Sequence, residues 1–190
     1  YPRDKNDDNT KYTMADAVFT ACFLNACNRN CDIVGMANFA PIVNTRGCIY
    51  TDQNGIVLRS TYHVFDLYVN YLGDIVLDLW NETTQFLSVR HKNGEKLDVE
   101  AVDLLATKFS DREGIALAAV NKDASQACEL TVEVGEAARY QVHTISGSST
   151  ESYNDVGHDE VMIQSTEWQT ITDALKVVLP PHSINVISIE

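Results

Sequence analysis

The spacing of hydrophobic positions changes near residue 73 and divides the chain into two parts. Residues 17–27 are apolar at nearly every position, apart from Thr20 and Asn25, which predicts a helix buried on more than one side. Residues 13–16 precede it with the spacing of a capping box. Residues 33–37 are apolar at successive positions and predict a strand covered on both faces.

The segment after this predicted strand is a long polar loop, to about residue 58, with Asn, Pro and Gly. A helix follows over residues 61–72, where apolar side chains recur at helical spacing and Gly73 stands where a helix C′ glycine is expected. A buried strand that leads into a long polar loop is typical of barrel enzymes. Because one parallel strand cannot be stable without neighbours, we expect residues 33–37 to pair with another chain, be covered, or stay ragged.

From residue 74 onward the apolar positions alternate with period two, which predicts strands. The predicted strands are residues 75–80, 85–89, 97–102, 114–120, 129–134, 140–145, 160–164, 175–179 and 183–189. Gly and Asn punctuate the segments between them, and Pro180 and Pro181 turn the chain before the last strand. Short strands at this spacing predict an antiparallel jelly roll or β-sandwich with the 61–72 helix packed nearby.

The expected fold is therefore mainly β: an antiparallel sandwich preceded by an α/β remnant of a (β/α)8 barrel. Residues 1–73 would be the closing piece of the barrel, with a helix, the last strand, a loop and a helix. Residues 74–190 would be the C-terminal sandwich. We therefore expect the chain to be the tail of a larger enzyme.

The charge of the chain narrows the choice of partners. With 27 acidic and 14 basic residues the formal net charge is -13, so neither nucleic acid nor an anionic membrane is expected to bind. No apolar run approaches the roughly 20 residues that span a bilayer. The acidic surface suits a neutral substrate such as a sugar.

The five cysteines are odd in number and show no C-x-x-C pair. We expect them to be reduced thiols, which favours a reducing compartment, the cytoplasm. No metal and no cofactor is expected.

Three motifs resemble the C-terminal part of an α-L-arabinofuranosidase of glycoside hydrolase family 51. The first is the helix of residues 12–26 with Asp32-Ile-Val-Gly-Met-Ala-Asn38, similar to a family segment that ends in Met-Ala-Asn. The second is Gly55-Ile-Val-Leu-Arg-Ser-Thr-Tyr-His-Val-Phe-Asp-Leu-Tyr68, and the third is Leu179-Pro-Pro-His-Ser-Ile-Asn-Val-Ile187. Together they span nearly the whole chain in order.

The resemblance implies a (β/α)8 barrel followed by a jelly roll, and a retaining hydrolase that removes terminal arabinofuranosyl groups from arabinan or arabinoxylan oligosaccharides. It also implies a homo-oligomeric intact enzyme. Two glutamates from earlier barrel strands do the chemistry in this family. Residues 1–81 hold no glutamate, so we expect no catalytic residue here and no activity of this chain alone.

Two asparagines are the candidate substrate contacts, because the barrel's final loop would rim the sugar pocket. They are Asn38 and Asn44, and the alternative for Asn44 is that it holds the loop backbone. Where the family often has a sugar-contacting Gln, this chain has Pro41, so that contact is lost or replaced. His63 and Asp66 are expected to form a helix-surface pair.

Two alternatives remain open. The sandwich could be a non-catalytic module that binds a partner or a polysaccharide, which a strip of exposed aromatics on one sheet face would favour. The parent could instead be a related barrel glycosidase with another specificity, such as an endoglucanase.

Overall fold

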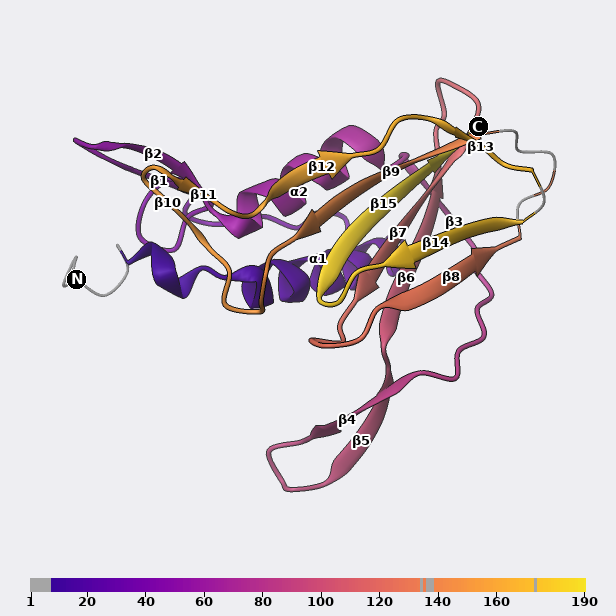
Figure 1. Ribbon diagram of the computed structural model, residues 1–190, viewed down its shortest axis with the longest axis horizontal. Coiled ribbons are helices and arrows are strands. Elements are labelled where there is room, and N and C mark those ends of the chain that lie inside the picture. Colours follow the sequence, from indigo (N-terminus) through magenta and orange to yellow (C-terminus); the bar gives the residue numbers. More distant parts are fainter. Residues whose placement is uncertain (1–7, 134, 136–138, 173) are drawn as a thin grey trace.

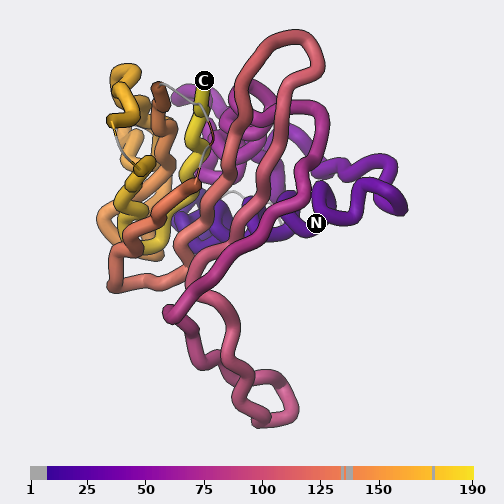
Figure 2. Tube along the Cα trace, turned by 90° about the vertical axis from the view of Figure 1, so that its right-hand side faces the viewer, coloured from indigo at the N-terminus to yellow at the C-terminus, as the bar shows by residue number. Residues whose placement is uncertain are grey.

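The structure is a computed structural model that describes residues 8–190 except 134, 136–138 and 173. Two helices cover one face of a large antiparallel sheet, and a two-stranded sheet covers the other face (Figure 1). The side view in Figure 2 shows one hairpin that projects away from these layers.

The helical layer begins with a short 3-10 turn. Its elements are η2 (Asn9–Lys11), α1 (Met14–Arg29) and α2 (Ser60–Tyr71). The predicted capping residues close the first turn of α1, where the Thr13 backbone N–H donates to Asp16 Oδ2 at 2.8 Å. Both helices bury one face against the large sheet, as the positions of Met14 on α1 and Leu67 on α2 show. The packing of the second helix near the sandwich is therefore confirmed.

The large sheet has seven antiparallel strands. They are β3 (Ile75–Leu77), β6 (Val102–Lys108), β7 (Ile115–Asn121), β9 (Arg139–Ser146), β12 (Met162–Ser165), β13 (Gln169–Thr170) and β15 (Ser183–Ile189). Their order is β12-β9-β15-β7-β6-β3, and β13 pairs with the far end of β9. The last strand of the chain, β15, lies in the middle, and its alternation sends Ile184 toward the helices and Ile187 toward the other face.

The second sheet consists of β8 (Cys128–Val132) and β14 (Leu175–Leu179). Leu175, Val177 and Leu179 of β14 are buried in the second core cluster, which fills the space between the two sheets. The predicted two-sheet antiparallel sandwich is therefore confirmed, although the sheets are very unequal. In the described part of residues 85–189 no helix interrupts it.

Three further hairpins complete the described chain. They are β1 (Ile49–Asp52) with β2 (Gly55–Leu58), β4 (Phe86–Arg90) with β5 (Lys96–Glu100), and β10 (Asn154–Asp155) with β11 (His158–Asp159). The sequence pattern missed the first and third hairpins and most of β6. The strand predicted over 97–102 covers all of β5 except its first residue, and only the first residue of β6.

The strand predicted at residues 33–37 is wrong in this structure. The segment is coil after α1, and Ile33 and Met36 are 78% and 77% exposed. A strand there needs at least one hydrogen-bonded neighbour, and the described chain places none beside the segment. It lies instead at a hollow of about 360 Å³ shared with α1 and α2.

Gly73 has a different role from the expected one. The helix ends with Leu72 in extended conformation, and Gly73 is not among the positive-φ glycines. A Cβ at Gly73 would lie 2.2 Å from the Lys108 carbonyl oxygen. The glycine therefore permits close contact between the chain after α2 and the end of β6.

Candidate functional site

The segment predicted to rim a sugar pocket runs from Asn38 to the start of β1. Asn38 lies in exposed coil. Asn44 has a φ of 56° and its Oδ1 accepts a hydrogen bond from the Thr51 backbone N–H at 2.8 Å. The Asn44 carbonyl also accepts from Gly47 N–H at 2.7 Å. Asn44 therefore holds the turn that leads into β1, which is the structural alternative considered for it.

A buried arginine anchors this loop. Arg59, just before α2, has no exposed surface, and its Nη1 donates to the carbonyl oxygens of Thr45 at 2.8 Å and Gly47 at 2.9 Å. Its Nε donates to Asn9 Oδ1 at 2.9 Å. The Tyr12 ring stacks on the guanidinium at 3.7 Å, and the Tyr12 hydroxyl donates to the same Thr45 carbonyl at 2.8 Å. One guanidinium thus joins the N-terminal turn, the loop and α2.

Only a glycine fits at the centre of the loop. A Cβ on Gly47 would lie 2.4 Å from the Ile42 carbonyl oxygen. The close approach lets the loop fold back on itself before β1, where the Ile49 N–H donates to that same carbonyl at 3.1 Å. The sequence motif that contains Arg59 predicts the helix that follows it but no role for the Arg59 side chain. The only sequence signal for a buried role of Arg59 is its position as a single basic residue between the apolar residues before it and the helix after it.

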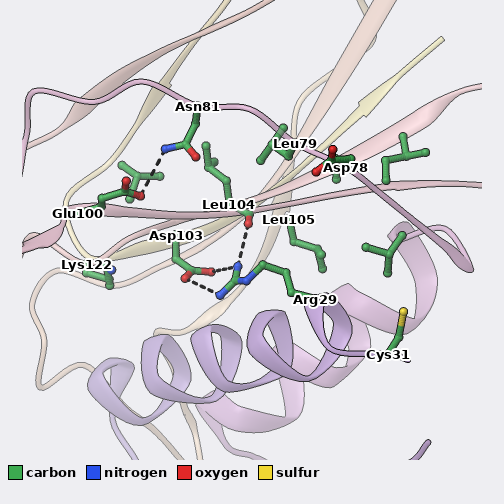
Figure 3. A pocket seen from close by; sticks show the side chains of 14 residues that line it. Arg29, Cys31, Asp78, Leu79, Asn81, Glu100, Asp103, Leu104, Leu105 and Lys122 are labelled. Atoms are coloured by element: carbon green, nitrogen blue, oxygen red, sulfur yellow. Dashed lines mark hydrogen bonds and ion pairs between the residues drawn. The ribbon is translucent and has the colours of Figure 1, made fainter. Parts of the chain in front are cut away.

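A second polar cluster joins the helices to the sheet beside a cavity of about 540 Å³ (Figure 3). Arg29 of α1 donates from Nη1 and Nη2 to the two carboxylate oxygens of Asp103, each at 3.0 Å, and from Nη1 to the Leu104 carbonyl at 2.8 Å. Asn25 Nδ2 donates to Asp103 Oδ1 at 2.7 Å, and the Tyr68 hydroxyl donates to Asn25 Oδ1 at 2.7 Å. The cluster satisfies every one of these partly buried groups, as a packed interface requires.

His63 is buried rather than paired at the helix surface, so the expected surface pair with Asp66 is wrong. It lies in the layer between α2 and the β10–β11 hairpin, with its Nε2 3.3 Å from Asn154 Nδ2. Burial lowers the pKa of His63 below its usual value. The helical period favours this outcome, because His63 lies one position before Val64 and four before Leu67, which are both buried.

The carboxylates with a shifted pKa among the described residues lack the property that the acid of a retaining pair needs. Such a pair needs a nucleophile and an acid with a raised pKa about 5 Å apart. Every shifted carboxylate among the described residues is shifted the other way, downward by hydrogen bonds. Glu160 is the strongest case: Ser148, Ser152 and the Ser148 N–H lower its pKa to about 2. Such a group stays ionised and serves as an acceptor.

The cysteines are free thiols, with Cys48 buried and Cys31 exposed. Burial raises the pKa of Cys22 to about 11, so this thiol is neutral and unreactive near pH 7. Among the described residues, no group of three or more His, Cys, Asp or Glu side chains is placed to hold a metal ion. No helix in the described part of the chain is long and apolar enough to cross a membrane.

The helix pair, its anchored loop and the unequal sandwich define a mainly antiparallel β domain with one helical layer. The sequence profile of the alpha-L-arabinofuranosidase C-terminal domain matches residues 2–183. The chain belongs to this family.

Relatives extend the match over nearly all of the chain. A probable alpha-L-arabinofuranosidase C of Aspergillus niger is 26% identical over 179 residues, which cover 93% of this chain and 34% of that protein. An intracellular exo-alpha-L-arabinofuranosidase of Bacteroides ovatus is 27% identical, covering 94% and 34%. The chain therefore spans about a third of the length of the curated relatives it matches.

Solved structures agree with this assignment. The alpha-L-arabinofuranosidase of Thermotoga maritima, solved with arabinose, has a TM-score of 0.82 at 25% identity and covers 97% of this chain and 39% of that one. The GH51 arabinofuranosidase of Xanthomonas axonopodis has a TM-score of 0.79 at 28% identity, covering 94% and 36%. The resemblance found in the sequence motifs is confirmed.

Proposed function

We propose that this chain is the C-terminal part of an α-L-arabinofuranosidase that removes terminal arabinofuranosyl groups from arabinan and arabinoxylan oligosaccharides with retention. The observation that carries the proposal is the family match across residues 2–183, in a chain that covers about a third of its relatives. The two catalytic glutamates would lie in the part of the enzyme upstream of this chain. Residues 1–73 would close the barrel, and residues 74–190 would form the sandwich domain.

The exposed apolar side chains of the helical layer support the proposal that residues 1–73 pack against an upstream barrel. Phe19, Phe23 and Val69 are more than half exposed on the helices, in addition to the exposed Ile33 and Met36 of the coil. Monomeric proteins rarely leave so many large apolar side chains in water on neighbouring elements. In the intact enzyme the remaining barrel would cover them, and residues 33–37 would gain the strand neighbours that they lack here.

The segment from Asn38 to the start of β1, called the rim loop below, would contribute part of the sugar pocket to that barrel. Asn38 has a free position in exposed coil from which to reach a sugar hydroxyl, whereas the Asn44 side chain already accepts the Thr51 N–H. In the intact enzyme, Asn38→Ala would lower kcat/KM for the arabinofuranoside. The free energy of unfolding would stay unchanged. Asn44→Ala would lower both activity and stability, and Gln53→Ala, an exposed residue of the β1–β2 turn, is the matched control.

The compartment and the assembly of the intact enzyme are part of the proposal. Five free thiols favour a reducing interior such as the cytoplasm, and the Bacteroides ovatus relative is named intracellular. We also propose that the intact enzyme is a homo-oligomer.

The test is the substrate preference of the longer protein that contains this chain. Purified enzyme is assayed on nitrophenyl α-L-arabinofuranoside, arabino-oligosaccharides and cello-oligosaccharides. Preference for the arabinofuranosides by more than a hundredfold supports the proposal. Preference for the glucan oligomers would overturn it in favour of an endoglucanase, and absence of hydrolysis would favour a non-catalytic module.

A further inference from the structure

A polar cavity of about 540 Å³ lies where the C-terminal end of α1 meets the edge of the large sheet (Figure 3). Its lining comes from the end of α1, from β3 and β6, and from the coil that follows β3. Proteins bind small organic ligands in cavities of roughly 300–1,000 Å³, so the volume suits a ligand. The Arg29–Asp103 pair explains only one wall, and the remaining polar groups need another explanation.

The cavity exists because the edge strand is short. β3 pairs with β6 over three residues, and the pair of Leu77 with Ala106 is the last before the chain leaves the sheet. In the described chain no strand lies beside the rest of β6 on this side. The coil of residues 78–85 forms the outer wall instead, and Asn81 Nδ2 donates to Glu100 Oε2 at 3.3 Å. The cavity therefore has hydrogen-bonding groups on more than one side.

The polar groups of the lining suit a neutral ligand that is rich in hydroxyl groups. Asp78 and Glu100 are acceptors, and Lys122 is a donor that forms no ion pair with a carboxylate of the described residues. Asn81 has both an amide oxygen and an N–H donor. A hydroxyl group donates and accepts, so it can pair with each of these groups, and its bonds to the ionised ones are the stronger.

Other classes of ligand fit this lining less well. The carboxylates of Asp78, Glu100 and Asp103 outnumber the cations of Arg29 and Lys122, so the formal net charge is -1, which disfavours an anion. Among the described residues, no group of three or more His, Cys, Asp or Glu side chains is placed to hold a metal ion. An apolar ligand would leave the charged groups without hydrogen-bond partners.

An exposed tryptophan lies directly beside the cavity. Trp80 stands in the coil between Leu79 and Asn81, which both line the cavity, and it is 84% exposed. A sugar ring carries hydroxyl groups at its edge and C–H groups on its faces, and the flat apolar surface of an indole can pack against such a face. The cavity and Trp80 together therefore provide both kinds of contact that a saccharide makes.

The cavity is separate from the rim loop, which is proposed to border the sugar pocket of the barrel. The rim loop is held near the N-terminal end of α1, where the Tyr12 hydroxyl donates to the Thr45 carbonyl at 2.8 Å. The cavity lies at the other end of this helix, beside Arg29. The helix has 16 residues, and a rise of about 1.5 Å per residue separates its two ends by roughly 24 Å. A ligand in the cavity therefore leaves the proposed active site free.

We propose that the cavity and Trp80 form an accessory binding site for a neutral oligosaccharide, which holds an arabinose polymer away from the site of hydrolysis. The identity of the sugar rests on the proposed function, whereas the site itself rests on the lining and on Trp80. A polymer that binds at two points presents its chain ends to the active site at a raised effective concentration. The site therefore matters for long arabinan chains and not for small substrates.

Fluorescence can locate the bound sugar, because Trp80 and Trp168 are the two tryptophans of the chain. Trp168→Phe leaves the indole of Trp80, and titration of the 190-residue chain with linear arabinopentaose should give a saturable change in its emission. Trp80→Phe leaves the indole of Trp168, which packs against Arg139, and its emission should not change. A flat Trp80 signal at millimolar oligosaccharide, or a Trp168 signal that saturates equally, overturns the proposal.

Substitutions in the lining test the hydrogen-bonding groups. In the Trp168→Phe background, Asn81→Ala and Lys122→Met should each weaken the binding of arabinopentaose at least fivefold, while circular dichroism shows that the chain stays folded. The matched controls are Asn93→Ala and Lys92→Met, at exposed positions of the turn between β4 and β5, and they should bind like the Trp168→Phe chain. Lining variants that bind as tightly as these controls refute the assignment of the ligand to the cavity.

The longer enzyme tests what the site does. In that protein Trp80→Ala should lower kcat/KM for linear arabinan at least fivefold, through KM, and leave kcat/KM for nitrophenyl α-L-arabinofuranoside unchanged. Trp168→Ala is the matched control and should change neither value. An equal loss on both substrates, or no loss on arabinan, contradicts an accessory site. If the longer enzyme hydrolyses neither substrate, the proposed function fails, and the fluorescence titration of the 190-residue chain still decides whether the cavity binds the saccharide.

Discussion

Arg29 and Asp103 form a two-point ion pair that joins α1 to β6, with both nitrogen–oxygen distances at 3.0 Å. The pair lies at the end of a chain of hydrogen bonds that starts at the Tyr68 hydroxyl on α2. The helices and the sheet are therefore held together by specific polar contacts as well as by apolar packing. The shared core includes residues from both sides of Gly73.

Removing the Asp103 carboxylate should loosen this contact. Asp103→Asn is expected to lower the free energy of unfolding by about 1–2 kcal/mol. The loss is limited because the half-exposed Arg29 guanidinium can hydrogen-bond to water in place of the carboxylate. Urea unfolding of Asp103→Asn, Arg29→Met and the double variant measures the coupling. Asp98→Asn, at an exposed position of β5, is the control. Additive effects of the two single changes would show that the pair is not coupled.

The buried guanidinium of Arg59 should control the order of the rim loop. Arg59→Met removes the guanidinium donor of the Gly47 carbonyl and leaves the Thr45 carbonyl with the Tyr12 hydroxyl. We expect a loss of about 3 kcal/mol in unfolding free energy. Hydrogen exchange at the Gly47 and Thr51 amides should accelerate more than that of the sheet. The control Arg46→Met, at an exposed position of the same loop, should change neither. Unaltered exchange at these amides in Arg59→Met would contradict the anchoring role.

Glu160 should make stability depend on acid pH. Its pKa is about 2 in the folded chain against an ordinary value of 4.5, so the carboxylate stabilises the fold above pH 4.5. This contribution fades as the pH falls from 4.5 toward 2. We expect Glu160→Gln to be less stable than the parent sequence by about 1–2 kcal/mol at pH 6.

Chemical denaturation at several pH values checks this, and the gap between the two proteins should close near pH 2. Glu151→Gln, an exposed glutamate of the same region, is the control and should show a small gap at every pH. A gap for Glu160→Gln that stays constant between pH 6 and pH 2 would contradict the assigned hydrogen bonds.

Gly73 should be irreplaceable for steric reasons. Gly73→Ala places a methyl group against the Lys108 carbonyl, and we expect a loss of about 2–3 kcal/mol. Gly35→Ala is the matched control, because a Cβ there meets nothing within 4 Å. Differential scanning calorimetry compares the two. Equal unfolding midpoints would show that the chain after α2 can move away from β6.

Periodicity predicted the helices and most strands because each buries one face in the layered core. Val64 and Leu67 repeat at helical spacing, and Ile184 and Val186 alternate on a strand. The prediction from periodicity failed at residues 33–37. An apolar run indicates that a segment is buried, but it does not identify the element that buries it. Periodicity also failed at β1–β2, whose turn rests on Asp52 accepting the Asn54 N–H. The roles of Arg59 and Arg29 depend on carbonyls and carboxylates far away in the sequence, which no local pattern contains.

The location of the active site can be measured by comparing the purified 190-residue chain with the proposed longer enzyme. Both are assayed for hydrolysis of nitrophenyl α-L-arabinofuranoside. Because the two catalytic glutamates are proposed to lie upstream of this chain, the longer enzyme should turn over the substrate. The 190-residue chain should show no turnover above background. Turnover by the 190-residue chain within tenfold of the longer enzyme would contradict the upstream location of the catalytic glutamates, because the active site would then lie in these residues.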